Sequence, residues 1–220
     1  MVHKCALLVV GLGNDLFSQF VHYFHPSQTT SYSIVLSDII GDPLDMIASG
    51  PAYPDSSTIF DVENIVRKYK LKIEPETEKL LTLETPKTLT NVTTSITGSV
   101  RQLCLAAHNK CIGLGYSPQI LTDSLNCTAR DAGMFLASIA RFHSNTQKSI
   151  AFIAGGETVV KLTGTGEGGR NQEIALASAS GIDGLADTAI FSFGSDGTDG
   201  PTDAAGGLFF CSPGYTTISL

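Results

Sequence analysis

Apolar residues recur along the chain with two different periods, and the two periods alternate. Short, almost continuous apolar runs bounded by glycine, proline or serine are typical of buried strands, whereas apolar residues three and four positions apart are typical of helices. The pattern predicts strands at residues 6–10, 33–36, 119–121, 149–154, 158–162 and 187–193. It predicts helices at residues 58–70, 75–83, 99–115, 127–142 and 170–180. Because strands and helices alternate, the predicted fold class is α/β with a largely parallel sheet.

A polar segment at residues 143–148 separates the expected helix 127–142 from the expected strand 149–154. A boundary between two compact parts of a chain is expected in such an exposed, polar stretch. The sequence therefore predicts two parts, residues 1–146 and residues 147–220. A length of 220 residues gives enough material for two small domains or one large one.

The second part contains two glycine-rich loops, at residues 164–169 and 194–203, which we call the first and second glycine-rich loops. Glycines let backbone N–H groups approach an anion, and a helix N-terminus adds positive potential. The first loop runs directly into an expected helix that begins at Arg170. The guanidinium of Arg170 could clamp a phosphate or a carboxylate with two hydrogen bonds, which makes it a catalytic candidate; the alternative is an ordinary surface arginine.

Candidates for binding a phosphate or a substrate lie in two segments. In the first glycine-rich loop and the start of the following helix they are Gly166, Gly168, Gly169 and Asn171. Asn171 equally suits a helix cap. Ser49 and Gly50 lie in a segment too rich in glycine and proline for regular structure, and their amides could meet a phosphate or simply form a turn.

The second glycine-rich loop carries Asp196, Asp199 and Asp203 just after an expected strand. Ligands of open α/β sheets bind at the carboxyl ends of strands. We therefore predict that Asp196 is a catalytic residue, which accepts the substrate hydroxyl proton or holds a metal, and that Asp196 and Asp199 bind Mg²⁺. Asp38 follows another strand and is a catalytic candidate by the same argument. The alternative is that the Asp-Gly pairs only form tight turns.

Composition narrows the classes of function. The net charge of −7 and the isoelectric point near 5.1, without a cluster of Lys and Arg, argue against nucleic-acid binding. No apolar stretch reaches the length of a membrane-spanning helix, so no membrane partner is expected. Five cysteines without a CxxC pair favour a reducing compartment, with the cytoplasm expected and the mitochondrion as the alternative. The GxxxxGK[ST] pattern is absent, so any nucleotide must be held differently from a P-loop kinase.

Several motifs give the chain a family resemblance. Residues 155–158 read GGET, residues 164–173 read GTGEGGRNQE, and residues 194–206 read GSDGTDGPTDAAG. Together they resemble the C-terminal domain of class II glycerate kinases, also called the MOFRL domain, with Ser195 where the family usually has threonine. Residues 37–58, which read SDIIGDPLDMIASGPAYPDSST, resemble a further segment of the same family.

The resemblance implies parts of two α/β domains, a Rossmann-like domain with a largely parallel sheet and then an incomplete MOFRL domain. It implies transfer of the γ-phosphate of ATP to D-glycerate with Mg²⁺, so the expected partners are D-glycerate and a nucleotide. Ser99 stands in the position of the family's GSN turn and is implied as a substrate-binding or phosphate-binding residue. Val100 replaces the asparagine of that turn, and residues 125–129 replace an acidic stretch. Each departure is expected to weaken contacts with substrate or nucleotide.

Members of the family are longer at both ends than this chain. They carry a glycine-rich segment with a functional lysine that has no counterpart in residues 1–32. The resemblance therefore predicts a truncated form that phosphorylates glycerate weakly or not at all. Its second sheet is expected to expose an unpaired edge or an apolar face, so low stability and association are expected too. Two alternatives stay open. One is a non-catalytic remnant that binds a nucleotide or a partner, and the other is an oxidoreductase acting on hydroxypyruvate, supported only by the GLG at residues 11–13.

Overall fold

The computed structural model of the chain describes residues 8–10, 31–37, 39–47, 50, 52–212 and 215–219. The chain forms two compact units, residues 1–102 and residues 103–220, and each is described by itself. The second unit begins earlier than residue 147 because the helix at Ala129–Phe142 packs against a helix that follows it. The division into residues 1–146 and 147–220 stays a prediction. Within the described ranges, none of the helices is both long and apolar enough to cross a membrane.

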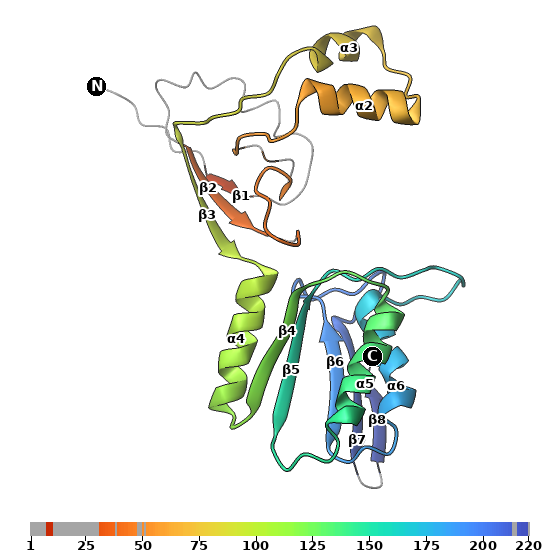
Figure 1. The fold of residues 1–220 in the computed structure, drawn as a ribbon. Coiled ribbons are helices and arrows are strands. Elements are labelled where there is room, and N and C mark those ends of the chain that lie inside the picture. Colours follow the sequence, from red (N-terminus) through yellow and green to blue (C-terminus); the bar gives the residue numbers. More distant parts are fainter. Residues whose placement is uncertain are drawn as a thin grey trace. The chain divides into compact units, whose positions relative to one another are not determined.

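The first unit is built on a small parallel sheet. Its strands are β1 (Leu8–Val10), β2 (Ser31–Leu36) and β3 (Val92–Gly98), hydrogen-bonded in that order (Figure 1). Both pairs are parallel. Two helices, α2 (Ile59–Tyr69) and α3 (Pro75–Leu81), lie between β2 and β3 in the sequence. Both strands and both helices predicted for this part of the chain are confirmed to within a few residues.

Helix α2 begins with a capping box. The Thr58 hydroxyl accepts a hydrogen bond from the backbone N–H of Asp61 at 3.3 Å, and the Asp61 carboxylate accepts one from the backbone N–H of Thr58 at 2.9 Å. This pairing satisfies two N–H groups that would otherwise lack a partner at the helix start. The hydrogen bonds from the Thr58 hydroxyl and then from its backbone lower the pKa of Asp61.

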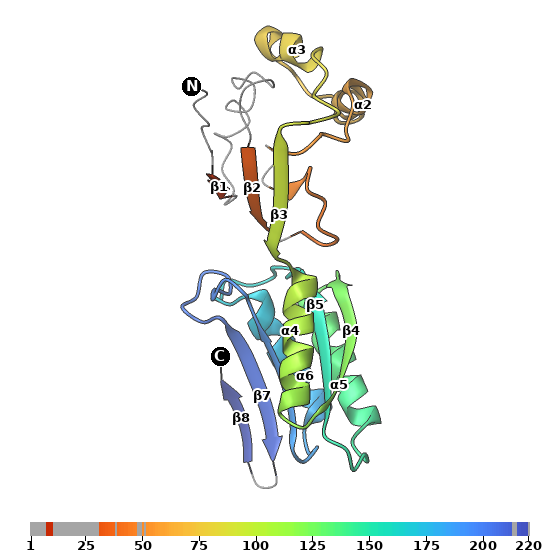
Figure 2. The same ribbon diagram turned by 90° about the vertical axis from the view of Figure 1, so that its left-hand side faces the viewer.

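The second unit combines a parallel pair of strands with an antiparallel sheet. Strands β4 (Ser117–Leu125) and β5 (Ile150–Gly156) are parallel. Strands β6 (Thr188–Phe193), β7 (Gly206–Ser212) and β8 (Tyr215–Ser219) form an antiparallel sheet in that order (Figure 1). Figure 2 shows β7 and β8 side by side. The α/β class is confirmed, but this last sheet is not parallel. The chain passes from β6 to β7 through a loop without a crossover helix, and such a short return produces antiparallel pairing.

One predicted strand is wrong. Residues 158–162 form no strand; Val159 makes only an isolated bridge with Thr128. The apolar residues of this run predict a buried strand, but they are not buried in the structure: Leu162 is 86% exposed. The connection between β5 and the next helix is therefore one long loop, residues 157–169, and the first glycine-rich loop is its final part.

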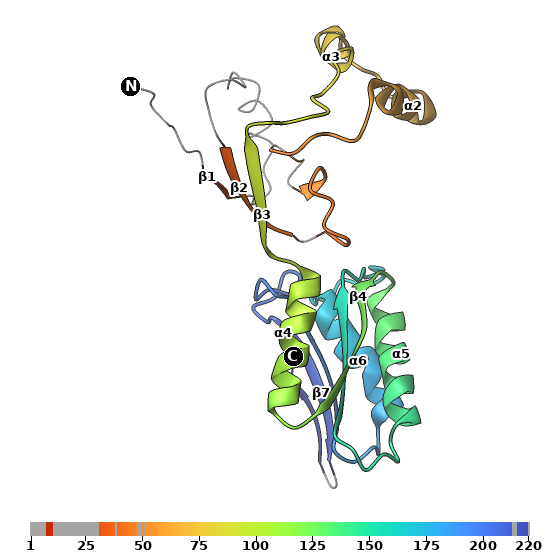
Figure 3. The same cartoon turned by 60° about the vertical axis from the view of Figure 1, so that its left-hand side comes forward.

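Three helices complete the second unit: α4 (Val100–Gly113), which belongs to this unit from Leu103 onward, α5 (Ala129–Phe142) and α6 (Arg170–Ile182). Helices α5 and α6 lie side by side, and α6 packs on β6 and β7 (Figure 3). The helices approach closely because their contact residues are small: a Cβ on Gly133 would lie 2.4 Å from the Ile174 carbonyl oxygen. The buried core between these helices and the sheet consists of Ala137, Ile182, Ile190, Phe209 and Cys211.

The other face of the β6–β7 pair is apolar and exposed. Side chains alternate between the two faces of a strand, so the neighbours of the buried Ile190 and Phe209 point away from the helices. Phe191 is 62% exposed and Phe193 is 53% exposed, and their rings stack with centroids 6.2 Å apart. Leu208 lies opposite Phe191 in the register. Of the two expected features, an unpaired edge or an apolar face, the described β6–β7 pair shows the exposed apolar face. Low stability and association stay predictions.

Candidate functional site

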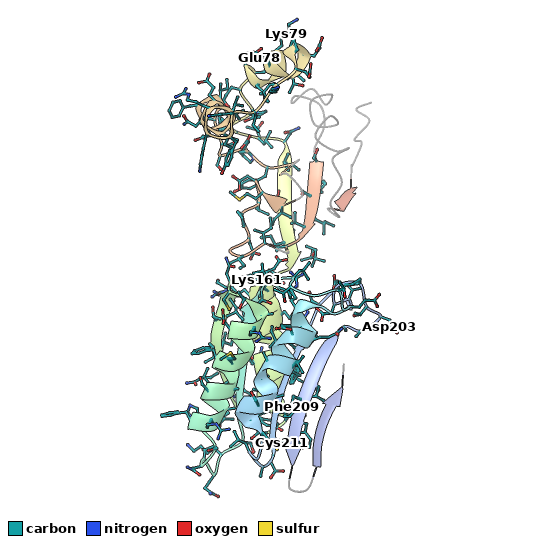
Figure 4. The ribbon with its side chains drawn as sticks, turned by 90° about the vertical axis from the view of Figure 1, so that its right-hand side faces the viewer. Glu78, Lys79, Lys161, Asp203, Phe209 and Cys211 are labelled. Carbon is teal, nitrogen blue, oxygen red and sulfur yellow. The ribbon has the colours of Figure 1, made fainter. Side chains whose placement is uncertain are left out.

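The two glycine-rich loops lie at the same end of the second unit. The first follows β5 by way of residues 157–163, and the second follows β6. In Figure 4, Lys161 lies in the segment that leads from β5 to the first loop, and Asp203 lies in the second loop. Phe209 and Cys211 lie further along, in β7. Carboxyl ends of strands are where α/β proteins place their ligand-binding loops, so this end of the unit is the candidate site.

Asp199 joins the second loop to the helix that follows the first. One of its carboxylate oxygens, Oδ1, accepts hydrogen bonds from the Asn171 backbone N–H and from Asn171 Nδ2, both at 3.0 Å. The other, Oδ2, accepts one from the backbone N–H of Gln172 at 2.8 Å. Asp199 is 2% exposed. These amides belong to the first turn of α6, so Asp199 acts as the cap of a helix that begins 29 positions before it.

Glycines make this contact possible at two positions. A Cβ added to Gly169 would lie 2.2 Å from Cγ of Asp199, far inside van der Waals contact. A Cβ added to Gly200 would lie 2.4 Å from the Gly168 carbonyl oxygen, and Gly200 has a φ of +62° that favours glycine. The two glycine-rich loops therefore interlock where they approach the start of α6.

Side chains around Asp199 extend the same network. The Asn171 Oδ1 atom accepts a hydrogen bond from the Ser192 hydroxyl at 2.6 Å, which ties α6 to β6. Gln172 Nε2 donates to the Thr202 hydroxyl at 2.8 Å, and that hydroxyl donates to the Asp199 carbonyl oxygen at 2.8 Å. Among the described side chains of the protein, no fully buried nitrogen or oxygen lacks a hydrogen-bond partner.

Arg170 and Asp196 lie on the exposed side of this network. Arg170 is the first residue of α6, and its Nη1 forms an ion pair with Glu157 Oε1 at 2.7 Å. Both side chains are about half exposed. The Asp196 carboxylate accepts hydrogen bonds from the Thr198 backbone N–H at 3.1 Å and from its hydroxyl at 3.0 Å. These two bonds, with a smaller contribution from the Arg170 charge, lower the pKa of Asp196.

The two aspartates predicted to bind Mg²⁺ have different surroundings. In the described part of the chain, no group of three or more His, Cys, Asp or Glu side chains could hold a metal ion. Mg²⁺ in phosphate-transfer sites is held by one or two carboxylates together with waters and substrate phosphates. The exposed carboxylate of Asp196 fits such a role. Asp199 does not, since three N–H donors surround its oxygens and would repel a cation.

The remaining predicted residues are distributed over both units. Gly166 and Gly168 lie in an exposed part of the first loop, with open space around Gly166. Gly50 has a φ of +58°, and its added Cβ would meet the Asp45 backbone at 2.5 Å, so a turn requires glycine there. Ser99 Oγ accepts a hydrogen bond from the backbone N–H of Gln102 at 3.3 Å, which suits the start of α4. Asp38 and Ser49 lie outside the described residues.

Sequence reasoning missed several members of this site. Glu157, the ion-pair partner of Arg170, belongs to the GGET motif but was given no role. Thr198, Thr202 and Ser192 were also missed; each contributes to the site through its side-chain hydroxyl. Small polar residues such as Thr198 and Thr202 are common in any loop, and Ser192 is a single polar residue within strand β6, so the sequence carries no signal for their roles. Only the position of Glu157 within a motif could have drawn attention to it.

Comparison with protein families matches two segments of the chain. Residues 150–214 match the MOFRL family, and residues 19–82 match a domain of unknown function, DUF4147. The MOFRL segment contains β5, α6, β6, β7 and both glycine-rich loops. The network around Asp199 therefore lies entirely within the matched MOFRL region.

Individual relatives cover most of the chain. A D-glycerate 2-kinase of Thermotoga maritima is 46% identical over 180 residues, which are 80% of this chain and 43% of the relative. A glycerate 2-kinase of Pyrococcus horikoshii is 37% identical over 194 residues, 81% of this chain and 44% of the relative. An Agrobacterium vitis protein with the provisional name hydroxypyruvate reductase is 34% identical over 196 residues, 84% of this chain and 50% of the relative. The chain thus spans about half the length of the curated relatives it matches.

A solved structure shares the fold. The crystal structure of glycerate kinase from Thermotoga maritima superposes with a TM-score of 0.79 at 42% sequence identity, covering 87% of this chain and 47% of that chain. On these matches, the chain belongs to the class II glycerate kinase family.

Proposed function

We propose that this chain carries the MOFRL part of a kinase that transfers the γ-phosphate of ATP to D-glycerate. The observation that carries the proposal is the exposed Arg170 at the start of α6, beside two interlocked glycine-rich loops. Two relatives bear the names D-glycerate 2-kinase and glycerate 2-kinase, which favours the 2-hydroxyl as the acceptor.

Arg170 is proposed to bind an anionic group of the substrates. A guanidinium forms two parallel hydrogen bonds with a carboxylate or a phosphate, and D-glycerate and ATP offer one of each kind. The ion pair with Glu157 holds the Arg170 side chain in place without burying it, because both groups remain about half exposed. An incoming anion can therefore reach the guanidinium and share or replace the Glu157 contact.

The exposed glycines of the first loop are proposed to offer backbone N–H groups to a phosphate, with Gly166 and Gly168 as the open positions. Asp196 is proposed to face the reacting groups, as acceptor of the hydroxyl proton or as the carboxylate that helps hold Mg²⁺. Bound Mg²⁺ would supply charge neutralisation on the phosphates. Asp38, Ser49, Gly50 and Ser99 remain proposals for further substrate contacts, carried by the family motifs in which they lie.

The test is a coupled assay of ADP release by the purified 220-residue chain with ATP, Mg²⁺ and D-glycerate. We expect glycerate-dependent ADP release at a rate below the ordinary kinase range of about 1–100 s⁻¹, and its loss in the Arg170→Ala variant. ATP binding in calorimetry without any ADP release would instead support a non-catalytic binding role. Oxidation of NADH or NADPH with hydroxypyruvate, in a parallel assay, would support the oxidoreductase alternative.

A further inference from the structure

We propose that Asp199 is a positioning residue of this site. Its carboxylate serves as a built-in anion at the N-terminus of α6, fixes the direction in which Arg170 leaves the helix, and directs substrate phosphates to Arg170 and the first glycine-rich loop. The part of this proposal that concerns substrates rests on the proposed kinase function. The part that concerns the helix rests on the contacts of Asp199 alone.

The first argument is that the buried carboxylate of Asp199 has hydrogen bonds to both of its oxygens. Three N–H groups converge on the two carboxylate oxygens of Asp199, at 2.8 to 3.0 Å, and two of them are backbone amides of the first turn of α6. Amides at a helix start lack partners within the helix and carry positive potential. Asp199 satisfies both needs at once, while the local residue at the N-cap, Gly169, has no side chain with which to do so.

The second argument is steric. Gly169 can approach Asp199 only without a Cβ, and Gly200 can approach Gly168 only without one. These two close approaches clamp the backbone immediately before Arg170 and immediately after Asp199. Arg170 therefore starts from a backbone that is held on its first-loop side by Gly169 and on its helix side by the Asn171 bonds.

The third argument concerns where a phosphate can bind. A helix N-terminus preceded by a glycine-rich loop is a common site for a phosphate. Here a second anion at the amides of Asn171 and Gln172 would meet the Asp199 carboxylate, which already occupies them. The exposed cation beside those amides is Arg170, and the open backbone is that around Gly166. A substrate phosphate is therefore expected to bind to Arg170 and to the backbone around Gly166, and not to the first amides of α6.

The experiment replaces the carboxylate and then returns it from solution. Asp199→Ala leaves a cavity that formate can enter, and Asp183→Ala removes the same group at the opposite end of α6 as the matched control. We expect the hydrogen-exchange protection of the Asn171 and Gln172 amides to fall about tenfold or more in Asp199→Ala, and formate to restore it. Formate should raise the melting temperature of this variant but not that of Asp183→Ala or of the unmodified protein.

Kinase turnover gives the second readout. A displacement of reacting groups by about 1 Å can cost about 100-fold in rate, so we expect that loss in Asp199→Ala, with partial recovery in formate. General destabilisation alone would not respond to formate. If Asp199→Ala does not fold, Asp199→Asn is measured instead, since it keeps the shape and places an amide donor against the helix amides.

Two results would overturn the proposal. One is equal hydrogen-exchange protection of the Asn171 and Gln172 amides in Asp199→Ala and in the unmodified protein. The other is that formate changes neither the protection of these amides nor the melting temperature of Asp199→Ala. An unmodified chain without glycerate-dependent turnover would contradict the proposed function instead. In that case the exchange and melting data still decide whether Asp199 holds the start of α6.

Discussion

Asp196 and Asp199 lie in the same loop, yet Asp199 is 2% exposed, whereas Asp196 is an exposed residue. Asp199 belongs to the base of the site, which we define as Gly169, Asn171, Asp199 and Gly200. Asp196 belongs to the rim, which we define as Glu157, Arg170 and Asp196. In the base the charge is surrounded by N–H donors from another element. In the rim the charges contact one another or a neighbouring threonine and remain open to water.

The difference separates two uses of the same residue types. A buried carboxylate with all its oxygens hydrogen-bonded cannot change partners without a large desolvation cost, so it fixes geometry. An exposed carboxylate or guanidinium exchanges its partner at little cost, so it can bind a substrate. We therefore expect substitutions in the rim to affect activity more than stability, and substitutions in the base to affect both.

The largest effect is expected for Arg170→Ala. Removing a cation that stabilises transferring phosphate should lower kcat/KM for glycerate by about 10²- to 10³-fold, while the free energy of unfolding changes by less than about 1 kcal/mol because the ion pair is exposed. Steady-state kinetics and urea unfolding check the two numbers. Glu157→Gln is the matched control, since it breaks the same ion pair and keeps the guanidinium. An equal loss of activity in both variants would mean that the pair, not the arginine, matters.

In the base, Gly169→Ala is expected to destabilise the protein by about 1–3 kcal/mol, as overpacking does, because its Cβ would collide with Asp199. Gly166→Ala serves as the control, since nothing lies within 4 Å of its added Cβ, and its unfolding free energy should change by less than about 1 kcal/mol. The midpoints of urea unfolding measure both. Similar midpoints for the two variants would contradict the close contact between Gly169 and Asp199 that we assign to the base of the site.

The smallest effect concerns the pH dependence of the rim. The Thr198 hydrogen bonds lower the pKa of Asp196 below its ordinary value of 3.8. A lowered folded-state pKa means that the stabilisation is present above pH 3.8 and is lost as the pH falls through the folded-state pKa. Thr198→Val keeps the backbone donor and removes the hydroxyl, so the pKa of Asp196 should rise partway toward 3.8. Carbon NMR of the Asp196 carboxyl group measures it, and identical titration curves would disprove the contribution of the hydroxyl.

Local patterns predicted much of the fold. The start of α6 at Arg170 could be predicted because two glycines precede a helical pattern, and the strand before the second loop could be predicted from its apolar run. The strand at 158–162 was wrong because apolarity alone does not supply a pairing partner. Strands β3, β7 and β8 were not predicted from the pattern. In β7, Gly206 and Gly207 at its start weaken a strand pattern.

The candidate site was predictable only in part. Motifs located both glycine-rich loops, and Arg170 lies at the helix start as expected. The burial of Asp199 could not be predicted, because an aspartate between glycines and threonine normally indicates an exposed turn. Its hydrogen-bond partners lie 27 and 28 residues earlier in the chain. Sequence periodicity describes neighbours along one element and carries no information about such a tertiary cap.

Helix α6 receives its end groups from distant parts of the chain. Asp199 caps its first turn, and Arg141 donates two hydrogen bonds, at 3.1 and 2.6 Å, to the Gly181 carbonyl oxygen in its last turn. A helix of 13 residues is marginal in water without such support. Closing contacts between residues far apart in sequence is slow, because chain entropy is lost first. In refolding, α6 should therefore gain protection only after α5 and the β6–β7 hairpin have formed, which makes it a late element of the second unit.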